Sequence, residues 1–100
     1  MEGLQSLYGN RLQAAILFGS RARGDHTFDS DFDIAVVLDG PVESRFDEVR
    51  AIGEFSYPLR FERGLHIQSL PLSAEMFARG DKPIIRNIKR DGIDLLTVLQ

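Results

Sequence analysis

Two short apolar runs on either side of a polar loop limit the possible folds of this 100-residue chain more than any other feature. Residues 13–18 (QAAILF) are too short for a typical helix, and residues 31–38 (DFDIAVVL) are rich in β-branched residues. Gly19-Ser20 interrupts the first run, and Asp39-Gly40-Pro41 ends the second with strong turn chemistry. We therefore predict two neighbouring strands joined by a polar connection.

The remaining segments indicate helices and one further strand. Residues 65–70 predict a third strand, with His66, Gln68 and Leu70 on one face. Apolar spacing and boundary residues predict the helices, which we place at 2–12, at 42–56 (through Phe46, Val49 and Ile52, ending before Pro58), after a Ser73 cap, and at 83–91. This order predicts an α+β fold, with a small mixed sheet of three to four strands and helices packed against it, as a single domain over residues 1–100.

The composition excludes several classes of protein. The chain has no cysteine, so disulfide bonds and thiolate metal sites are excluded. No apolar run approaches the roughly 18 residues of a membrane span, and the N-terminus lacks the pattern of a signal peptide. The net charge is −3, so we expect no direct DNA binding. We expect a cytoplasmic protein with no membrane contact.

Asp31 and Asp33 are two positions apart at the start of the second predicted strand. Side chains alternate along a strand, so both carboxylates should lie on the same face. Two adjacent carboxylates repel each other unless a cation lies between them, and Mg²⁺ typically takes one or two carboxylates. We predict a Mg²⁺ site at this pair, the alternative being solvated residues at a strand start.

The Gly19-Ser20 turn supplies a second feature of the same segment. A helix that begins at Ser20 would direct its first N–H groups and its dipole at an anion such as phosphate. Arg21 and Arg23 are close by and could pair with the same anion. Phosphate binding at one end of the segment and metal binding at the other indicate phosphoryl or nucleotidyl transfer.

The segment GSRARGDHTFDSDFD resembles the signature of the DNA polymerase β-like nucleotidyltransferase superfamily. In that signature Gly-Ser is followed by Asp-x-Asp after a spacer as long as residues 21–30. The flanking residues, ILFGSRARGD and SDFDIAVVL, and the closing IIRNIKRDGIDLL are similar to the minimal nucleotidyltransferases of antitoxin type. The similarity runs through most of the chain and implies the nucleotidyltransferase fold.

The resemblance also implies a function. Members of this family are commonly the antitoxin of a two-protein module, with a small helical HEPN-type ribonuclease toxin as partner. Some transfer AMP from ATP to a tyrosine of that toxin and so neutralise it. By carry-over, Gly19, Ser20, Arg21 and Arg23 would bind the nucleotide, while Asp31 and Asp33 would be catalytic and would bind Mg²⁺.

One departure from the family pattern leaves alternatives open. The superfamily takes a third carboxylate from a later strand, but residues 64–72 (GLHIQSLPL) contain no Asp or Glu. His66 could replace it as a general base, or Glu62, just before the strand, could reach the site if the strand begins earlier; Glu75 lies just after it. Alternatively, the site is slow or inactive and the protein neutralises its partner by binding alone. Aminoglycoside-modifying nucleotidyltransferases share the core motif but carry an additional domain, and we expect no room for one here.

The last predicted helix carries a second cluster of charge. Pro83 near its first turn and Gly92 as its stop set its limits, and we expect Ile84, Ile85 and Ile88 on its buried side. The opposite side carries four basic residues, Lys82, Arg86, Lys89 and Arg90. This basic face could contact a triphosphate or an acidic partner, but a solvated outer face is the simpler interpretation.

Overall fold

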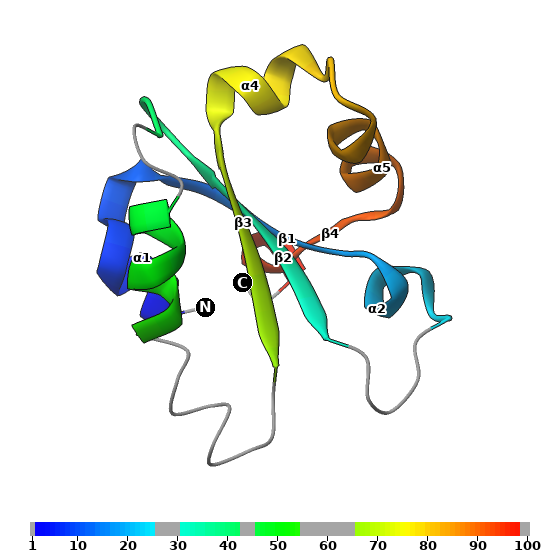
Figure 1. Cartoon of the computed structure of the whole chain (residues 1–100), viewed down its shortest axis with the longest axis horizontal. Helices are drawn as coiled ribbons and strands as arrows, with labels where there is room; N and C mark the ends of the chain where they lie inside the picture. The colour runs from blue at the N-terminus through cyan, green and yellow to red at the C-terminus, as the bar shows by residue number, and fades with distance from the viewer. Residues whose placement is uncertain (1, 26–30, 43–45, 55–65, 99–100) are drawn as a thin grey trace.

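The computed structural model describes residues 2–25, 31–42, 46–54 and 66–98 of the chain. The elements in chain order are α1 (Glu2–Tyr8), a 3₁₀ turn (Gly9–Arg11), β1 (Leu12–Phe18), α2 (Ser20–Arg23), β2 (Phe32–Leu38), a helix over residues 46–54, β3 (Ile67–Ser73), α4 (Ala74–Arg79), α5 (Pro83–Asp91), β4 (Ile93–Asp94) and α6 (Leu95–Val98) (Figure 1).

The four strands form one mixed sheet in the order β3-β2-β1-β4. β1 runs antiparallel to both β2 and β4, whereas β2 and β3 are parallel. The parallel pair requires a crossover, and the helix of residues 46–54 lies in it. The predicted α+β fold with a mixed sheet and packed helices is therefore confirmed.

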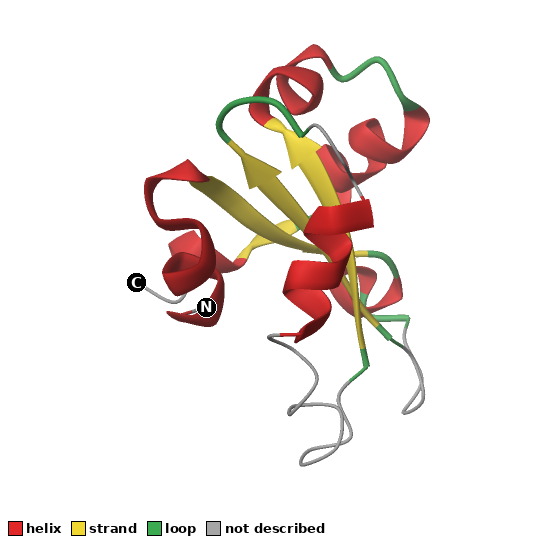
Figure 2. Cartoon of the chain, turned by 60° about the vertical axis from the view of Figure 1, so that its left-hand side comes forward, coloured by secondary structure: helices red, strands yellow, loops and turns green. Residues whose placement is uncertain are grey.

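Helices cover both faces of the sheet, and each face has its own core (Figure 2). Alternation along β2 divides its residues between the two cores. Ile34, Val36 and Leu38 pack with Leu4 of α1 and Ile52 of the helix over residues 46–54. Ala35 and Val37 belong to the other core, whose remaining buried members are Ile16, Leu72, Ile85 and Ile88. The face of Ala35 and Val37 is thus the one covered by α4 and α5.

Several predicted boundaries need correction. The predicted helix over residues 2–12 ends earlier, because Gly9 at φ +58° breaks the α-helix and Leu12 already begins β1. The third strand is Ile67–Ser73 rather than 65–70. It continues through Pro71 because β3 is an edge strand, where a missing N–H leaves no ladder bond unmade. Pro58 lies outside the described residues.

The predicted apolar stripes are only partly buried. Ile85 and Ile88 of α5 are buried as predicted, but Ile84 is 42% exposed. In the helix over residues 46–54 Ile52 is buried, whereas Phe46 is 70% exposed with the Arg50 guanidinium over its ring. The apolar face of a helix can be wider than the part that packs against the sheet, so some of its apolar residues stay exposed.

The C-terminal strand and helix were not predicted. β4 contains two residues, which is too short for any alternation to be recognised. Ile93 and Asp94 pair with Leu17 and Ile16 of β1, and Asp94 then accepts the N–H of Leu96 to cap α6. The predicted Ser73 cap of α4 is confirmed by its bond from the Met76 N–H (3.1 Å). Within the described ranges, no helix is long and apolar enough to cross a membrane.

Candidate active site

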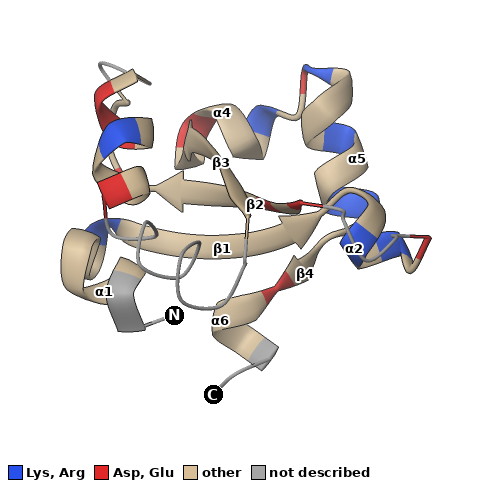
Figure 3. Ribbon diagram, turned by 60° about the horizontal axis from the view of Figure 1, so that its bottom comes forward, with Lys and Arg blue, Asp and Glu red and all other residues tan. Residues whose placement is uncertain are grey.

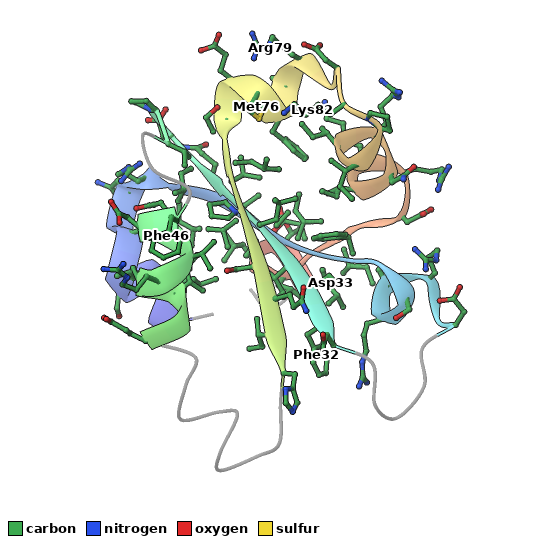
Figure 4. The ribbon with its side chains drawn as sticks, in the orientation of Figure 1. Phe32, Asp33, Phe46, Met76, Arg79 and Lys82 are labelled. Carbon is green, nitrogen blue, oxygen red and sulfur yellow. The ribbon has the colours of Figure 1, made fainter. Side chains whose placement is uncertain are left out.

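Asp31 and Asp33 lie at the N-terminal end of β2, on the side of the sheet covered by α4 and α5. Asp33 shares its face with Ala35, as the strand period predicts, and Asp31 directly precedes the strand. Asp33 is level with Phe18, the last residue of β1, and with Gln68 near the start of β3. Figure 4 shows Asp33 at the opposite end of the strands from Met76 of α4. The pair therefore lies at the start of β2, with the end of β1 on one side and the start of β3 on the other.

The turn after β1 comes directly against this carboxylate pair. Gly19 has φ +72° and ψ −154°, a backbone conformation that is essentially restricted to glycine. A Cβ atom at Gly19 would collide with Oδ2 of Asp33 and would lie 3.3 Å from its Cγ. Both the conformation and the space therefore require glycine at this position, and the result is direct contact between the turn and the acidic pair.

The charges at the site show why a cation fits it. Partial burial raises the pKa of the Asp33 carboxyl, and the neighbouring Asp31 carboxylate raises it further, while Arg23 acts in the opposite direction. The positive charge of Arg23 thus does not fully offset the cost of ionising Asp33 beside Asp31. Two carboxylates on one face are a donor set that suits Mg²⁺, which completes its shell with water and substrate oxygens. The residues present therefore fit one Mg²⁺ ion.

The third position facing the pair is Gln68, not an acid. Gln68 is level with Asp33 in the parallel register, and its Nε2 donates a hydrogen bond to Oδ2 of Asp31 (2.9 Å). Among the residues that the structure describes, no group of three or more His, Asp or Glu side chains could hold a metal ion. Alternation predicted the face of Gln68, but no sequence signal revealed its bond to Asp31.

The other candidates for the third group lie in different places. His66 directly precedes β3 with an exposed side chain, and its carbonyl accepts the Phe32 N–H (2.8 Å) at the aspartate end of β2. Glu75 is in the first turn of α4, at the far end of β3, and its carboxylate is 4.0 Å from Arg79. The structure therefore places Glu75 away from the pair. Glu62 lies outside the described residues.

The two arginines after the turn point in different directions. The Arg21 guanidinium lies 4.2 Å from the centroid of the Phe32 ring, and Phe32 is directed to the opposite face of β2 from Asp33. The charge of Arg23 acts on the Asp33 carboxyl, where it opposes the raising effects of burial and of Asp31 on the pKa. Arg23 Nε is also 3.2 Å from Oδ2 of Asp25. Arg23 is therefore the nearer candidate for contact with bound phosphate.

Ser20 begins α2, directly after Gly19. The helix is a single turn, in which the N–H of Arg23 bonds to the Gly19 carbonyl (3.1 Å) and the N–H of Gly24 bonds to the Ser20 carbonyl (2.9 Å). A helix does begin at Ser20, and this first residue is half-buried directly after Gly19. Binding of nucleotide by Gly19 and Ser20 stays a prediction.

The basic residues of α5 (Figure 3) have structural partners for most of their charges. Nη1 of Arg86 donates to the carbonyls of Gly80 (3.3 Å) and Asp81 (2.8 Å), in the connection from α4. Nζ of Lys89 donates to the Ala78 carbonyl near the end of α4 (3.3 Å). These bonds hold α4 against α5 by satisfying carbonyls at the helix end.

The remaining two charges of the basic face are at its ends. Arg90 bonds to the neighbouring Asp91 through two nitrogens, at 3.0 and 2.9 Å. Lys82 precedes the first turn of α5 and is exposed. This arrangement supports the interpretation of the basic face as a packed and solvated surface rather than a phosphate site.

Comparison with known proteins identifies a family and a relative that this chain resembles. A family model described as a nucleotidyltransferase domain matches residues 1–95. A protein from Methanocaldococcus jannaschii named "Putative protein adenylyltransferase MJ0604" is 39% identical over 77 residues, which is 77% of this chain and 70% of the relative. The match therefore spans most of this chain and more than two thirds of the relative.

Two solved structures are similar to this fold. A "putative nucleotidyltransferase" from Sulfolobus solfataricus has a TM-score of 0.63 and 28% identity, with 93% of this chain and 68% of the other covered. A structure described as a toxin-antitoxin with AMP-PNP has a TM-score of 0.60 and 22% identity over 92% of this chain and 66% of the other. At that identity the second likeness concerns the fold alone.

Proposed function

The chain belongs to the nucleotidyltransferase domain family, and on that premise we propose that it transfers AMP from ATP to a side chain of a partner protein. The observation that carries the proposal is the placement of Asp31 and Asp33 on one face of β2, against the Gly19 turn. That arrangement brings a cation-binding pair and a glycine turn into contact, as transfer of a nucleotide requires. The relative named as an adenylyltransferase supports the choice of AMP as the group transferred.

We assign roles to the residues as follows. Asp31 and Asp33 hold Mg²⁺, and the Gly19-Ser20 turn and Arg23 receive the phosphates, with Arg21 as a more distant contact. Bound Mg²⁺ would polarise the α-phosphate and offset the charge of the leaving pyrophosphate. The chain's own groups fix the direction of attack by holding the phosphates between the β1 turn and β2.

The proposed reaction exchanges one bond at the α-phosphorus for another. The acceptor hydroxyl oxygen bonds to that phosphorus, the bond to the oxygen bridging the β-phosphate breaks, and pyrophosphate leaves with the electron pair. The hydroxyl proton must pass to a base. His66 is the candidate, because its backbone is tied to Phe32 at the aspartate end of β2 and a neutral imidazole nitrogen can accept a proton.

We further propose that the partner is a HEPN-type toxin and that the acceptor is one of its tyrosines, in the cytoplasm. The resemblance of the Gly19-Ser20 and Asp31-x-Asp33 motif to the minimal nucleotidyltransferases of antitoxin type motivates this partner. A protein described as a toxin-antitoxin with AMP-PNP shares the fold. In this assignment the chain acts as a nucleotidyltransferase domain over residues 1–100. Neutralisation then follows from covalent modification of the toxin.

A modification assay tests the proposal. The protein is incubated with Mg²⁺, ATP labelled at the α-phosphate and the purified partner toxin, and the partner is analysed by mass spectrometry. We expect the added mass of AMP on a tyrosine with the wild type, and no addition with an Asp31→Asn, Asp33→Asn double variant. A partner that is fully inhibited yet unmodified would contradict the proposed transfer.

One observation favours a second candidate function, neutralisation by binding alone. Gln68 lies where a third carboxylate would face the pair, so the described part of the site lacks an acidic base. This function predicts that the folded double aspartate variant still protects cells from the toxin. Loss of protection by that variant would support the adenylyltransferase instead.

A further inference from the structure

Gln68 links β3 to the acidic pair through a side-chain hydrogen bond. Its Nε2 lies 2.9 Å from Oδ2 of Asp31, and the ionised carboxylate accepts while the amide donates. Gln68 is exposed, so burial does not force this contact. The bond instead depends on the parallel register that sets Gln68 level with Asp33, which is two residues after Asp31 on the same face.

The backbone fixes this register at the site itself. The N–H of Phe32, between the two aspartates, donates to the carbonyl of His66 (2.8 Å), and Phe32 is level with Ile67. Gln68 therefore reaches Asp31 from a strand whose backbone, at His66, is hydrogen-bonded to the residue between the two aspartates. This geometry holds one oxygen of Asp31 toward β3 and leaves its other oxygen for a ligand.

The neutral amide also sets the charge of the site. Asp31 and Asp33 carry two negative charges when ionised, which one divalent cation balances. A carboxylate at Gln68 would add a third charge at the position level with Asp33. Glu75 cannot supply it, because it lies in α4 beyond the far end of β3. In the described part of the site, ligands are thus present for a single cation.

We infer that Gln68 is a positioning residue that orients the Asp31 carboxylate and restricts the site to one divalent cation. The inference rests on the proposed function, because it takes Asp31 and Asp33 as the Mg²⁺ ligands. Hydrogen-bond partners of metal-binding carboxylates commonly contribute about 10- to 100-fold to metal affinity. Gln68 would thereby act through Asp31 without touching the reacting atoms.

The test uses Mn²⁺ alone as the probe, with free Mn²⁺ counted by electron paramagnetic resonance. Gln68→Met keeps the length of the side chain and removes the donor, whereas Gln68→Glu removes the donor and adds a charge. Gln13→Met, at an exposed glutamine near the start of β1, is the matched control. Thermal melts verify that each variant is folded.

We expect the wild type and Gln13→Met to bind one Mn²⁺ per chain with equal affinity. Gln68→Met should bind one ion about 10-fold more weakly. Gln68→Glu should bind Mn²⁺ more tightly than the wild type, and its melting temperature should fall when Mn²⁺ is withheld, because three carboxylates then repel each other.

Two results would overturn the inference while leaving the proposed function in place. One is an unchanged Mn²⁺ affinity in Gln68→Met, and the other is two equivalent ions per chain in the wild type. A wild type that binds no more Mn²⁺ than the Asp31→Asn, Asp33→Asn variant would remove the proposed metal site and the inference together. The modification assay reports on the proposed function separately.

Discussion

The backbone of Gly19 lies so close to the carboxylate of Asp33 that no side chain fits between them. Gly19 ends a buried strand in a conformation that is essentially restricted to glycine, and Asp33 opens the neighbouring strand level with Phe18. The contact therefore joins the two halves of the motif, which are separated by residues 21–30 in the sequence. It makes the geometry of the acidic pair depend on the turn after β1.

Gly19→Ala should destabilise the protein and weaken cation binding together. The alanine must adopt a strained conformation and displace the Asp33 carboxylate, at a cost on the order of 1–3 kcal/mol for the strain alone. Urea unfolding measures the stability, and titration with Mn²⁺ and AMP-PNP measures binding. Gly40→Ala is the control, since Gly40 also has positive φ (85°) but no atom within 4 Å of an added Cβ. Equal losses in the two variants would argue against a special contact at Gly19.

Asp33→Asn should stabilise the protein without metal while it abolishes Mn²⁺ binding. Burial and the Asp31 charge raise the pKa of Asp33, so its ionised form costs the folded state free energy at neutral pH. We expect a gain on the order of 0.5 kcal/mol, which is about 2–4 °C in melting temperature for a chain of this size. Calorimetry with and without Mn²⁺ measures both effects.

The gain from Asp33→Asn should depend on pH in a defined direction. Because the folded pKa is raised, the stability that Asp33 contributes is present below the ordinary carboxyl pKa and is lost as the pH rises through the folded value. The melting-temperature difference between variant and wild type should grow from acid toward neutral pH. Asp39→Asn, at an exposed aspartate after the other end of β2, serves as the control. A difference that shrinks toward neutral pH would contradict the assignment.

Arg23 should contribute more to nucleotide binding than Arg21. Arg23 acts on the charge of Asp33, whereas the Arg21 guanidinium stacks on Phe32 on the other side of β2. We expect Arg23→Gln to weaken AMP-PNP binding about 10-fold, as for loss of a charge-assisted contact, and Arg21→Gln to weaken it less than about threefold. Isothermal titration calorimetry decides the order, and the reverse order would place the phosphates on the Phe32 side.

The Tyr8 hydroxyl and Oε2 of Glu48 are buried polar atoms away from the site. Within the described residues neither the Tyr8 hydroxyl nor Oε2 of Glu48 makes a hydrogen bond of ordinary geometry. Burial and then the Glu48 carboxylate raise the pKa of Tyr8 to about 12. Tyr8→Phe removes an unpaired buried hydroxyl, so we expect unchanged or higher stability, by up to about 1 kcal/mol in urea unfolding.

The same pair gives an expectation at alkaline pH. Since the folded pKa of Tyr8 is raised from 10.0 to about 12, the wild type should lose stability as the pH rises from 10 to 12. Tyr8→Phe should lose less over that window, as followed by circular dichroism during urea unfolding. A steeper loss in Tyr8→Phe would show that the hydroxyl is stabilised by a partner when ionised.

Local patterns in the sequence predicted the features that depend on near neighbours in the chain. The alternation of residues 31–38 places Asp31 and Asp33 together, since successive strand side chains point to opposite faces whatever lies around them. Helix limits also follow from residues close in the chain: Ser73 caps the start of α4, and Pro83 and Gly92 mark the two ends of α5.

The tertiary structure decided the features that join distant segments. Pairing of β2 with β3 sets Gln68 level with Asp33 and against Asp31, and packing on Phe32 turns Arg21 away from the pair. The register between strands that are far apart in the chain depends on how their buried faces pack, so the spacing of residues within one strand does not predict it. The sequence by itself thus determined that an acidic pair and a glycine turn exist, and only the folded sheet determined which side chains lie against them.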